Sequence, residues 1–123
     1  MCDFSGFQEP EMVKTRPVVI LRKHRTNSKL VTVVPLSMTK PAATKAYHHE
    51  FSTNPIPTAM PWEITWAKCD MVATISIDRL DRFKVKIQGL RQYIEPHIND
   101  EDFQAIRQCV AAALGLTDLM EKS

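Results

Sequence analysis

Three short runs of β-branched and aliphatic residues, in a fixed order along the chain, constrain its fold more than any other feature. They span residues 16–21 (RPVVIL), 33–37 (VVPLS) and 66–75, which opens as WAKCD. Runs of this length and composition are typical of buried strands rather than helices. Each run also carries a polar residue at one end. The chain is therefore predicted to form a small sheet that presents functional groups at its rim.

The remaining segments extend this β pattern. We expect strands at residues 17–21 and 30–36 joined by a turn at 27–28, a short strand at 47–51, one continuous strand at 62–75, and a half-exposed strand at 84–87. Residues 4–13 are expected to be irregular, and the prolines in 52–61 indicate an extended connection. Ser76 is expected to cap a single turn at residues 77–80.

One amphipathic helix is predicted near the C-terminus, at about residues 100–114. Asn99 suits its N-cap, and the acidic residues 100–102 suit the positive end of its dipole. The apolar stripe consists of Phe103, Ile106, Val110, Ala113 and Leu114, and Gly115 is a natural stop. Short strands followed by one such helix predict a mainly β fold, a small barrel or curled antiparallel sheet with the helix packed on it.

The composition bounds the class of protein. A chain of 123 residues with 44% hydrophobic and 24% charged residues is expected to be one globular domain, residues 1–123. It contains no apolar run of membrane-spanning length, and its N-terminus does not resemble a secretion signal. Three widely spaced cysteines without a CxxC pair favour reduced thiols in a cytoplasm over zinc binding or disulfides. No metal or cofactor is expected.

Basic residues gather in one short stretch, although the net charge is only +2. The stretch contains Arg22, Lys23, Arg25 and Lys29, and no acidic residue occurs between Lys14 and Lys45. Such a cluster can hold a phosphate backbone by charge attraction. It is equally consistent with a solvated loop between the first two strands.

The three ordered runs resemble the PemK/MazF-like toxins of bacterial type II toxin–antitoxin pairs, which are small ribonucleases. The resemblance covers about residues 11–116. It implies an SH3-like barrel with a C-terminal helix, assembled as a homodimer. It also implies metal-independent cleavage of single-stranded RNA, and an antitoxin whose acidic, disordered tail covers the RNA groove. The basic stretch would then lie close to the RNA-binding face.

The resemblance also assigns site residues. Arg16 matches the arginine of the family's Arg-Pro motif, a principal catalytic residue, and its guanidinium suits two phosphate oxygens. Ser37 matches the Thr or Ser beside the scissile phosphate, although a Ser after a strand is commonly a turn residue. Lys68 and Asp70 match the Arg and Asp of the family's Arg-Cys-Asp stretch. On one strand these two would share a face, where they could equally form an ordinary surface ion pair.

The resemblance also suggests further RNA-contacting residues, but it does not assign one proton acceptor. Thr74 and Glu11 also match family positions, whereas Pro10 stands where many members have a substrate-contacting His. Only residues 1–4 remain of the family's first strand. The proton acceptor is left open between Asp70 and either His48 or His49. Trp62, Trp66 and Phe51 are expected in the core, with base stacking as the alternative.

Two functions of other classes remain open. One is a barrel of the same fold that binds a protein target such as a topoisomerase. The other is a non-catalytic relative that binds nucleic acid or a partner protein. Substitution of Arg16 would separate both from a nuclease.

Overall fold

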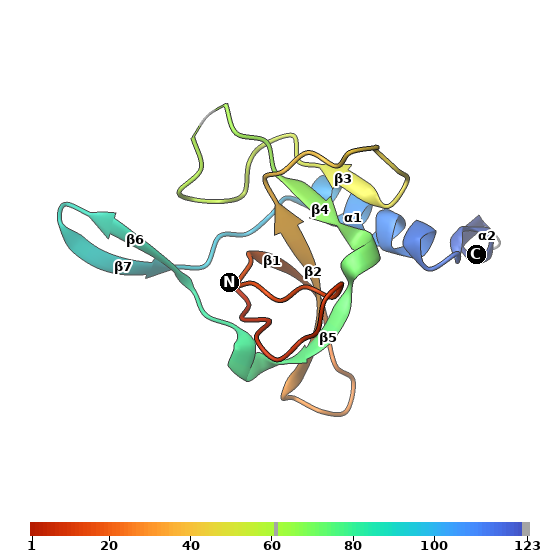
Figure 1. Ribbon diagram of the computed structural model, residues 1–123, viewed down its shortest axis with the longest axis horizontal. Helices are drawn as coiled ribbons and strands as arrows, with labels where there is room; N and C mark the ends of the chain where they lie inside the picture. The colour runs from red at the N-terminus through yellow and green to blue at the C-terminus, as the bar shows by residue number, and fades with distance from the viewer. Residues whose placement is uncertain (61, 122–123) are drawn as a thin grey trace.

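Antiparallel strands dominate the fold. The computed structural model describes residues 1–60 and 62–121 (Figure 1). Its main sheet contains β1 (Val18–Lys23), β2 (Leu30–Ser37), β3 (His48–Glu50), β4 (Trp66–Lys68) and β5 (Ala73–Ser76). The strand order is β1-β2-β4-β3, and β5 also pairs with β2. The predicted strands 17–21, 30–36 and 47–51 are thus confirmed with small changes at their ends.

Strand β2 organises the sheet because it pairs with three other strands. Along one edge it pairs with β1, and along the other it pairs first with β5 and then with β4. Pro35 lies at this change of partner, between Val33, which pairs with Ala73, and Leu36, which pairs with Ala67. A proline has no N–H to donate. Because Pro35 lies where β2 changes partner, the missing donor interrupts no ladder hydrogen bond.

This change of partner also shows that the predicted continuous strand at residues 62–75 is wrong. Residues 62–75 do not form one continuous strand, because the 3₁₀ turn η1 (Cys69–Met71) separates β4 from β5. The second 3₁₀ turn, η2 (Ile77–Arg79), follows β5 directly. It is capped as predicted, since the Ser76 hydroxyl accepts a 3.2 Å hydrogen bond from the Asp78 amide.

The N-terminal segment covers one face of the sheet. Cys2 forms bridges with Arg16 on one side and with Leu80 on the other, so a remnant of a first strand is present. The Met1 ammonium donates to the Asp81 carbonyl at 2.8 Å. Cys2 and Phe4 pack there against Val31, Val33 and Ile75 to form one of two apolar cores.

Helix α1 (Asp100–Ala113) covers the opposite face. Its Ile106 and Val110 are buried against Val19, Val34 and Leu36 in the second core. Asn99 caps the helix as predicted, with its side chain accepting from the Asp102 amide at 2.7 Å. Gly115 ends it at a φ of 71°, and the Leu116 amide donates to the Ala111 carbonyl. Leu114 is exposed rather than part of the stripe, since it lies in this C-terminal cap.

One strand and one helix were absent from the sequence prediction. The predicted strand at 84–87 is β6 (Phe83–Ile87), but it pairs with an unpredicted strand, β7 (Leu90–Ile94). This hairpin is a separate two-stranded sheet that projects away from the rest of the molecule (Figure 1). The short helix α2 (Thr117–Glu121) follows α1. The pairings among the described residues leave the main sheet open, so a closed barrel is not found.

The helices are short. Within the described ranges, neither α1 nor α2 has the length and apolar character needed to cross a bilayer.

Candidate active site

The residues of interest lie in a row across the main sheet. Trp66 of β4 pairs with Ser37 of β2 on one side and with Glu50 of β3 on the other. The Leu36 amide donates to the Pro17 carbonyl at 2.9 Å, which continues the β1–β2 register and brings Arg16 opposite Ser37. Directly opposed residues of antiparallel strands project from the same face. Arg16, Ser37, Trp66 and Glu50 therefore form one row, which we call the site row.

Arg16 is held by its backbone and has an unpaired side-chain donor. Its amide and carbonyl both bond to Cys2, at 2.9 and 2.7 Å. Among the residues that the structure describes, its Nε is the one buried side-chain nitrogen or oxygen without a hydrogen-bond partner. A buried N–H in a low-dielectric setting is costly unless an acceptor reaches it. An anionic acceptor such as a phosphate would satisfy this donor.

Ser37 and Lys68 project from the same face as Arg16. Ser37 is only 5% exposed, and its hydroxyl oxygen accepts from the Thr39 amide at 3.1 Å. That bond fixes the oxygen and leaves the hydroxyl hydrogen available to donate elsewhere. Lys68 is half-buried, pairs with His48, and lies two positions along β4 from Trp66. Alternation along the strand gives Lys68 and Trp66 a common face.

Asp70 does not share this arrangement. It lies in η1 rather than on a strand, so the expectation that Asp70 and Lys68 lie on one continuous strand is wrong. Its side chain is exposed, and the ion pairs found among the described residues do not join it to Lys68. Asp70 follows the buried Cys69 in this turn.

The basic stretch lies far from Arg16. Arg22 is six residues further along the chain, which is about 20 Å in an extended strand. Arg22, Lys23, Arg25 and Lys29 are all exposed at the β1–β2 connection. The loop is ordered by His24, whose Nδ1 accepts from the amides of Thr26 and Asn27 at 3.2 and 3.0 Å. One chain therefore does not bring this stretch and Arg16 together.

Neither of the other two expected contact residues, Thr74 and Glu11, is a member of the site row. The Thr74 hydroxyl bonds to the Thr32 hydroxyl at 2.9 Å. Thr32 is an odd number of positions from Ser37 on β2, so the two project from opposite faces. Glu11 lies in the N-terminal segment, where its carboxylate accepts from the Gln8 amide at 3.1 Å.

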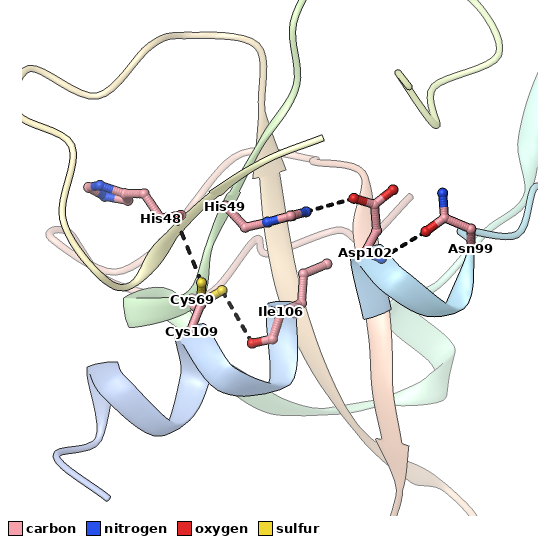
Figure 2. A network of polar contacts seen from close by, with 7 residues as sticks. All are labelled: His48, His49, Cys69, Asn99, Asp102, Ile106 and Cys109. Carbon is pink, nitrogen blue, oxygen red and sulfur yellow. Dashed lines mark hydrogen bonds and ion pairs between the residues drawn. The ribbon is translucent and has the colours of Figure 1, made fainter. Parts of the chain in front are cut away.

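The two adjacent histidines have distinct surroundings (Figure 2). His49 Nε2 is 2.8 Å from Asp102 Oδ1, a contact that joins β3 to the first turn of α1 with both side chains largely buried. His48 points the other way, and its Nδ1 accepts from the Lys45 amide at 3.1 Å. The sequence placed Asp102 in a helix dipole role and missed this pair, since no local signal links residues 53 positions apart.

Two thiols meet beneath the histidines (Figure 2). Cys69 Sγ donates to the Ile106 carbonyl and Cys109 Sγ to the His48 carbonyl, both at 3.7 Å. Burial raises the pKa of the Cys69 thiol, and contact with Cys109 raises it further. Burial likewise raises the pKa of Cys109. Cys69 faces the core as expected, and the cysteines are free. In residues 1–60 and 62–121 no three His, Cys, Asp or Glu side chains converge as a metal site.

Comparisons with known proteins agree with this architecture. The sequence matches the profile of a family described as "PemK-like, MazF-like toxin of type II toxin-antitoxin system" over residues 1–114. It is 34% identical over 105 residues to the uncharacterized protein YifN of Escherichia coli (strain K12), covering 82% of this chain and 69% of YifN. The fold is similar to that of the Mycobacterium tuberculosis toxin MazF-mt6, with a TM-score of 0.58 and 21% identity over 86% of this chain and 92% of that one. The chain therefore belongs to the PemK-like, MazF-like toxin family of type II toxin–antitoxin systems.

Proposed function

We propose that this protein is an endoribonuclease toxin that cleaves single-stranded RNA without a metal ion. The RNA 2′-oxygen attacks the adjacent phosphorus, the bond from phosphorus to the 5′-oxygen breaks, and a 2′,3′-cyclic phosphate and a 5′-hydroxyl result. The 2′-hydroxyl proton must be removed, and the departing 5′-oxygen must be protonated. The observation that carries the proposal is the buried, unpaired Arg16 Nε in line with Ser37.

Arg16 and Ser37 would stabilise the phosphorane. The Arg16 guanidinium offers its unsatisfied donor and the rest of its fork to two phosphoryl oxygens. The Ser37 hydroxyl, whose oxygen is already fixed by the Thr39 amide, would donate its hydrogen to a phosphoryl oxygen. Both groups are preorganised by strand pairing, so little rearrangement would accompany the change in charge.

Lys68 and Asp70 are proposed for proton transfer. Lys68 lies on the face of the site row and would protonate the 5′-oxygen or balance the charge of the phosphate. Asp70 would accept the 2′-hydroxyl proton from the neighbouring turn. His49 is assigned a structural role instead, because its Nε2 is engaged by Asp102.

The assembly and partners complete the proposal. We infer a homodimer, with the open main sheet as a derivative of the SH3-like barrel, acting in the cytoplasm. The exposed Arg22, Lys23, Arg25 and Lys29 would attract RNA, with Glu11 and Thr74 as lesser contacts. An antitoxin with an acidic, disordered tail would neutralise the same charges.

The test is cleavage of a long single-stranded RNA in excess EDTA. Discrete fragments are expected from the wild-type protein and none from Arg16→Ala, while Arg107→Ala, an exposed arginine on α1, should cleave normally. Arg16→Ala should remain folded and still bind RNA. RNA binding without cleavage by the folded wild-type protein would contradict the proposal and favour a non-catalytic binding module.

A further inference from the structure

A groove of about 690 Å³ opens beside the site row. It lies between the chain that follows β2 and the segment that precedes β4, and its lining includes Met38, Lys40, Glu50, Trp62, Ile64 and Trp66. Two of these residues, Trp66 and Glu50, belong to the site row itself. The groove is thus a direct continuation of the proposed cleavage site.

The groove exposes apolar surface that the fold does not need for its core. Trp62 is 75% exposed, and Met38 and Ile64 are each nearly half exposed, whereas Trp66 is buried, with only 7% of its surface exposed. This corrects the expectation that both tryptophans belong to the core. A broad exposed aromatic side chain beside a polar rim is typical of a binding surface.

The charges at the groove select the part of a nucleotide that fits it. Glu50 and Glu63 line it together with a single cation, Lys40. The Glu63 carboxylate already accepts from the Met60 amide at 2.8 Å, whereas the Glu50 carboxylate has no hydrogen-bond or ion-pair partner within the described part of the chain. Two carboxylates disfavour a phosphate. They accept hydrogen bonds from the amino and ring N–H groups of a base.

The spacing suits a nucleotide next to the scissile phosphate. Adjacent strands lie about 4.8 Å apart, so Glu50 is roughly 10 Å from Ser37, with Trp66 between them. A phosphate held by Arg16 and Ser37 would thus leave the neighbouring base beyond the buried Trp66 and beside the exposed Trp62. Stacking on aromatic side chains is the usual way in which single-stranded RNA is held.

We propose that this groove is a base-binding subsite that stacks one unpaired RNA base on Trp62 and reads it through the Glu50 carboxylate. Guanine is the preferred base, because its ring N1–H and its amino group present two adjacent donors to the two carboxylate oxygens. Adenine and cytosine present one amino group, and uracil presents only a ring N–H. The inference rests on the proposed ribonuclease function, which it deepens by naming the base beside the cleaved bond.

Binding of short 2′-O-methyl RNA oligomers tests the inference without any cleavage. A uridine hexamer with one central guanosine is expected to bind the wild-type protein and quench tryptophan emission, which comes only from Trp62 and Trp66. Trp62→Ala should weaken binding roughly 10-fold and remove the quenching. Glu50→Gln should remove the preference for guanosine over adenosine, because an amide offers only one acceptor oxygen. Tyr93→Ala, an exposed aromatic on the β6–β7 hairpin, should change none of these values.

The failures of the two proposals are distinguishable. If wild-type protein cleaves unmodified RNA but Trp62→Ala and Glu50→Gln leave affinity and base preference unchanged, the subsite is wrong and the nuclease stands. Base-selective quenching without cleavage of unmodified RNA would overturn the nuclease and support the subsite. Quenching by a leucine-rich peptide but not by RNA would overturn the subsite in favour of a protein-binding groove.

Discussion

At the scale of single residues, we expect the forked guanidinium of Arg16 to matter as much for the proposed cleavage as its charge. A lysine keeps the positive charge but cannot present two parallel donors, and it loses the buried Nε that awaits an acceptor. Arg16→Lys is therefore expected to lower the cleavage rate about 100-fold, with a smaller loss of RNA affinity. Single-turnover cleavage and equilibrium binding measure the two effects separately. Equal cleavage rates for the lysine variant and the wild type would show that charge alone suffices.

Cys69 gives the stability of the protein a pH dependence of known sign. Burial raises the pKa of its thiol above the value of about 8.5 expected in the unfolded chain. Below that pH both states keep the proton. Above it the unfolded chain ionises first, so the free energy of unfolding falls by up to about 1.4 kcal/mol per pH unit for this group until the folded thiol also ionises.

Cys69→Ala tests this dependence. Chemical denaturation between pH 8 and 10 should show a shallower loss of stability in Cys69→Ala than in the wild type. Cys2 and Cys109, whose pKa values burial also raises, contribute to the slope that remains. Identical slopes in the variant and the wild type would mean that the Cys69 thiol is not buried as described.

The structural role of a residue was predictable from the sequence only where its neighbours in the chain determine that role. The Ser76 cap, the Asn99 cap and the Gly115 stop follow from neighbouring residues, and the structure has each where the sequence indicated. The His49–Asp102 pair depends on how α1 crosses β3, which no short window of sequence contains. The groove beside Trp62 was missed for the same reason.

At the scale of elements, the His49–Asp102 contact attaches α1 to the sheet. Asp102 is 5% exposed and lies in the first turn of the helix, where its carboxylate bonds to the imidazole. Asp102→Ala is expected to lower the free energy of unfolding by about 2 kcal/mol, because a buried hydrogen bond to a charged group is lost. Asp100→Ala, an exposed acidic residue in the same turn, is the matched control and should change it by less than about 0.5 kcal/mol. Equal effects of the two substitutions would contradict this role.

The β6–β7 hairpin is expected to be the least stable element. It forms a sheet of its own, and Ile87, Leu90 and Tyr93 are exposed. Two-stranded hairpins are marginally stable without a packing partner. Hydrogen exchange should therefore show its amides to be roughly 100-fold less protected than those of β1 and β2. Equal protection would indicate that a second chain covers the hairpin.

The predicted strand boundaries were wrong where strand pairing, rather than local composition, decides where a strand ends. The run 62–75 reads as one strand, yet β2 can hold β4 and β5 on one edge only if the chain turns between them at η1. Strand β7 has the sequence LRQYI, in which adjacent polar residues interrupt the apolar alternation that revealed β6, and four of its five residues are exposed. Both errors arise from tertiary arrangement.

At the scale of the whole molecule, the basic stretch and the proposed catalytic residues lie in two separate regions. Arg16, Ser37 and Lys68 share one face of the sheet, while the basic β1–β2 connection lies about 20 Å away along β1. The sequence predicted a mainly β fold with a helix packed on it, but the proximity of these two regions was assumed and is not found within one chain. An RNA that contacts both must either extend along the sheet or bridge two copies.

The central claim is that the 2′-hydroxyl of the RNA performs the attack, and one substrate tests it most directly. A single-stranded RNA with one cleavage site, mapped beforehand, is compared with the same RNA carrying 2′-deoxyribose at that nucleotide, both in excess EDTA. We predict that the unmodified RNA yields a fragment ending in a 2′,3′-cyclic phosphate, and that the deoxy-substituted RNA binds equally well and is not cut. Cleavage of the deoxy-substituted RNA at the same bond would contradict the account.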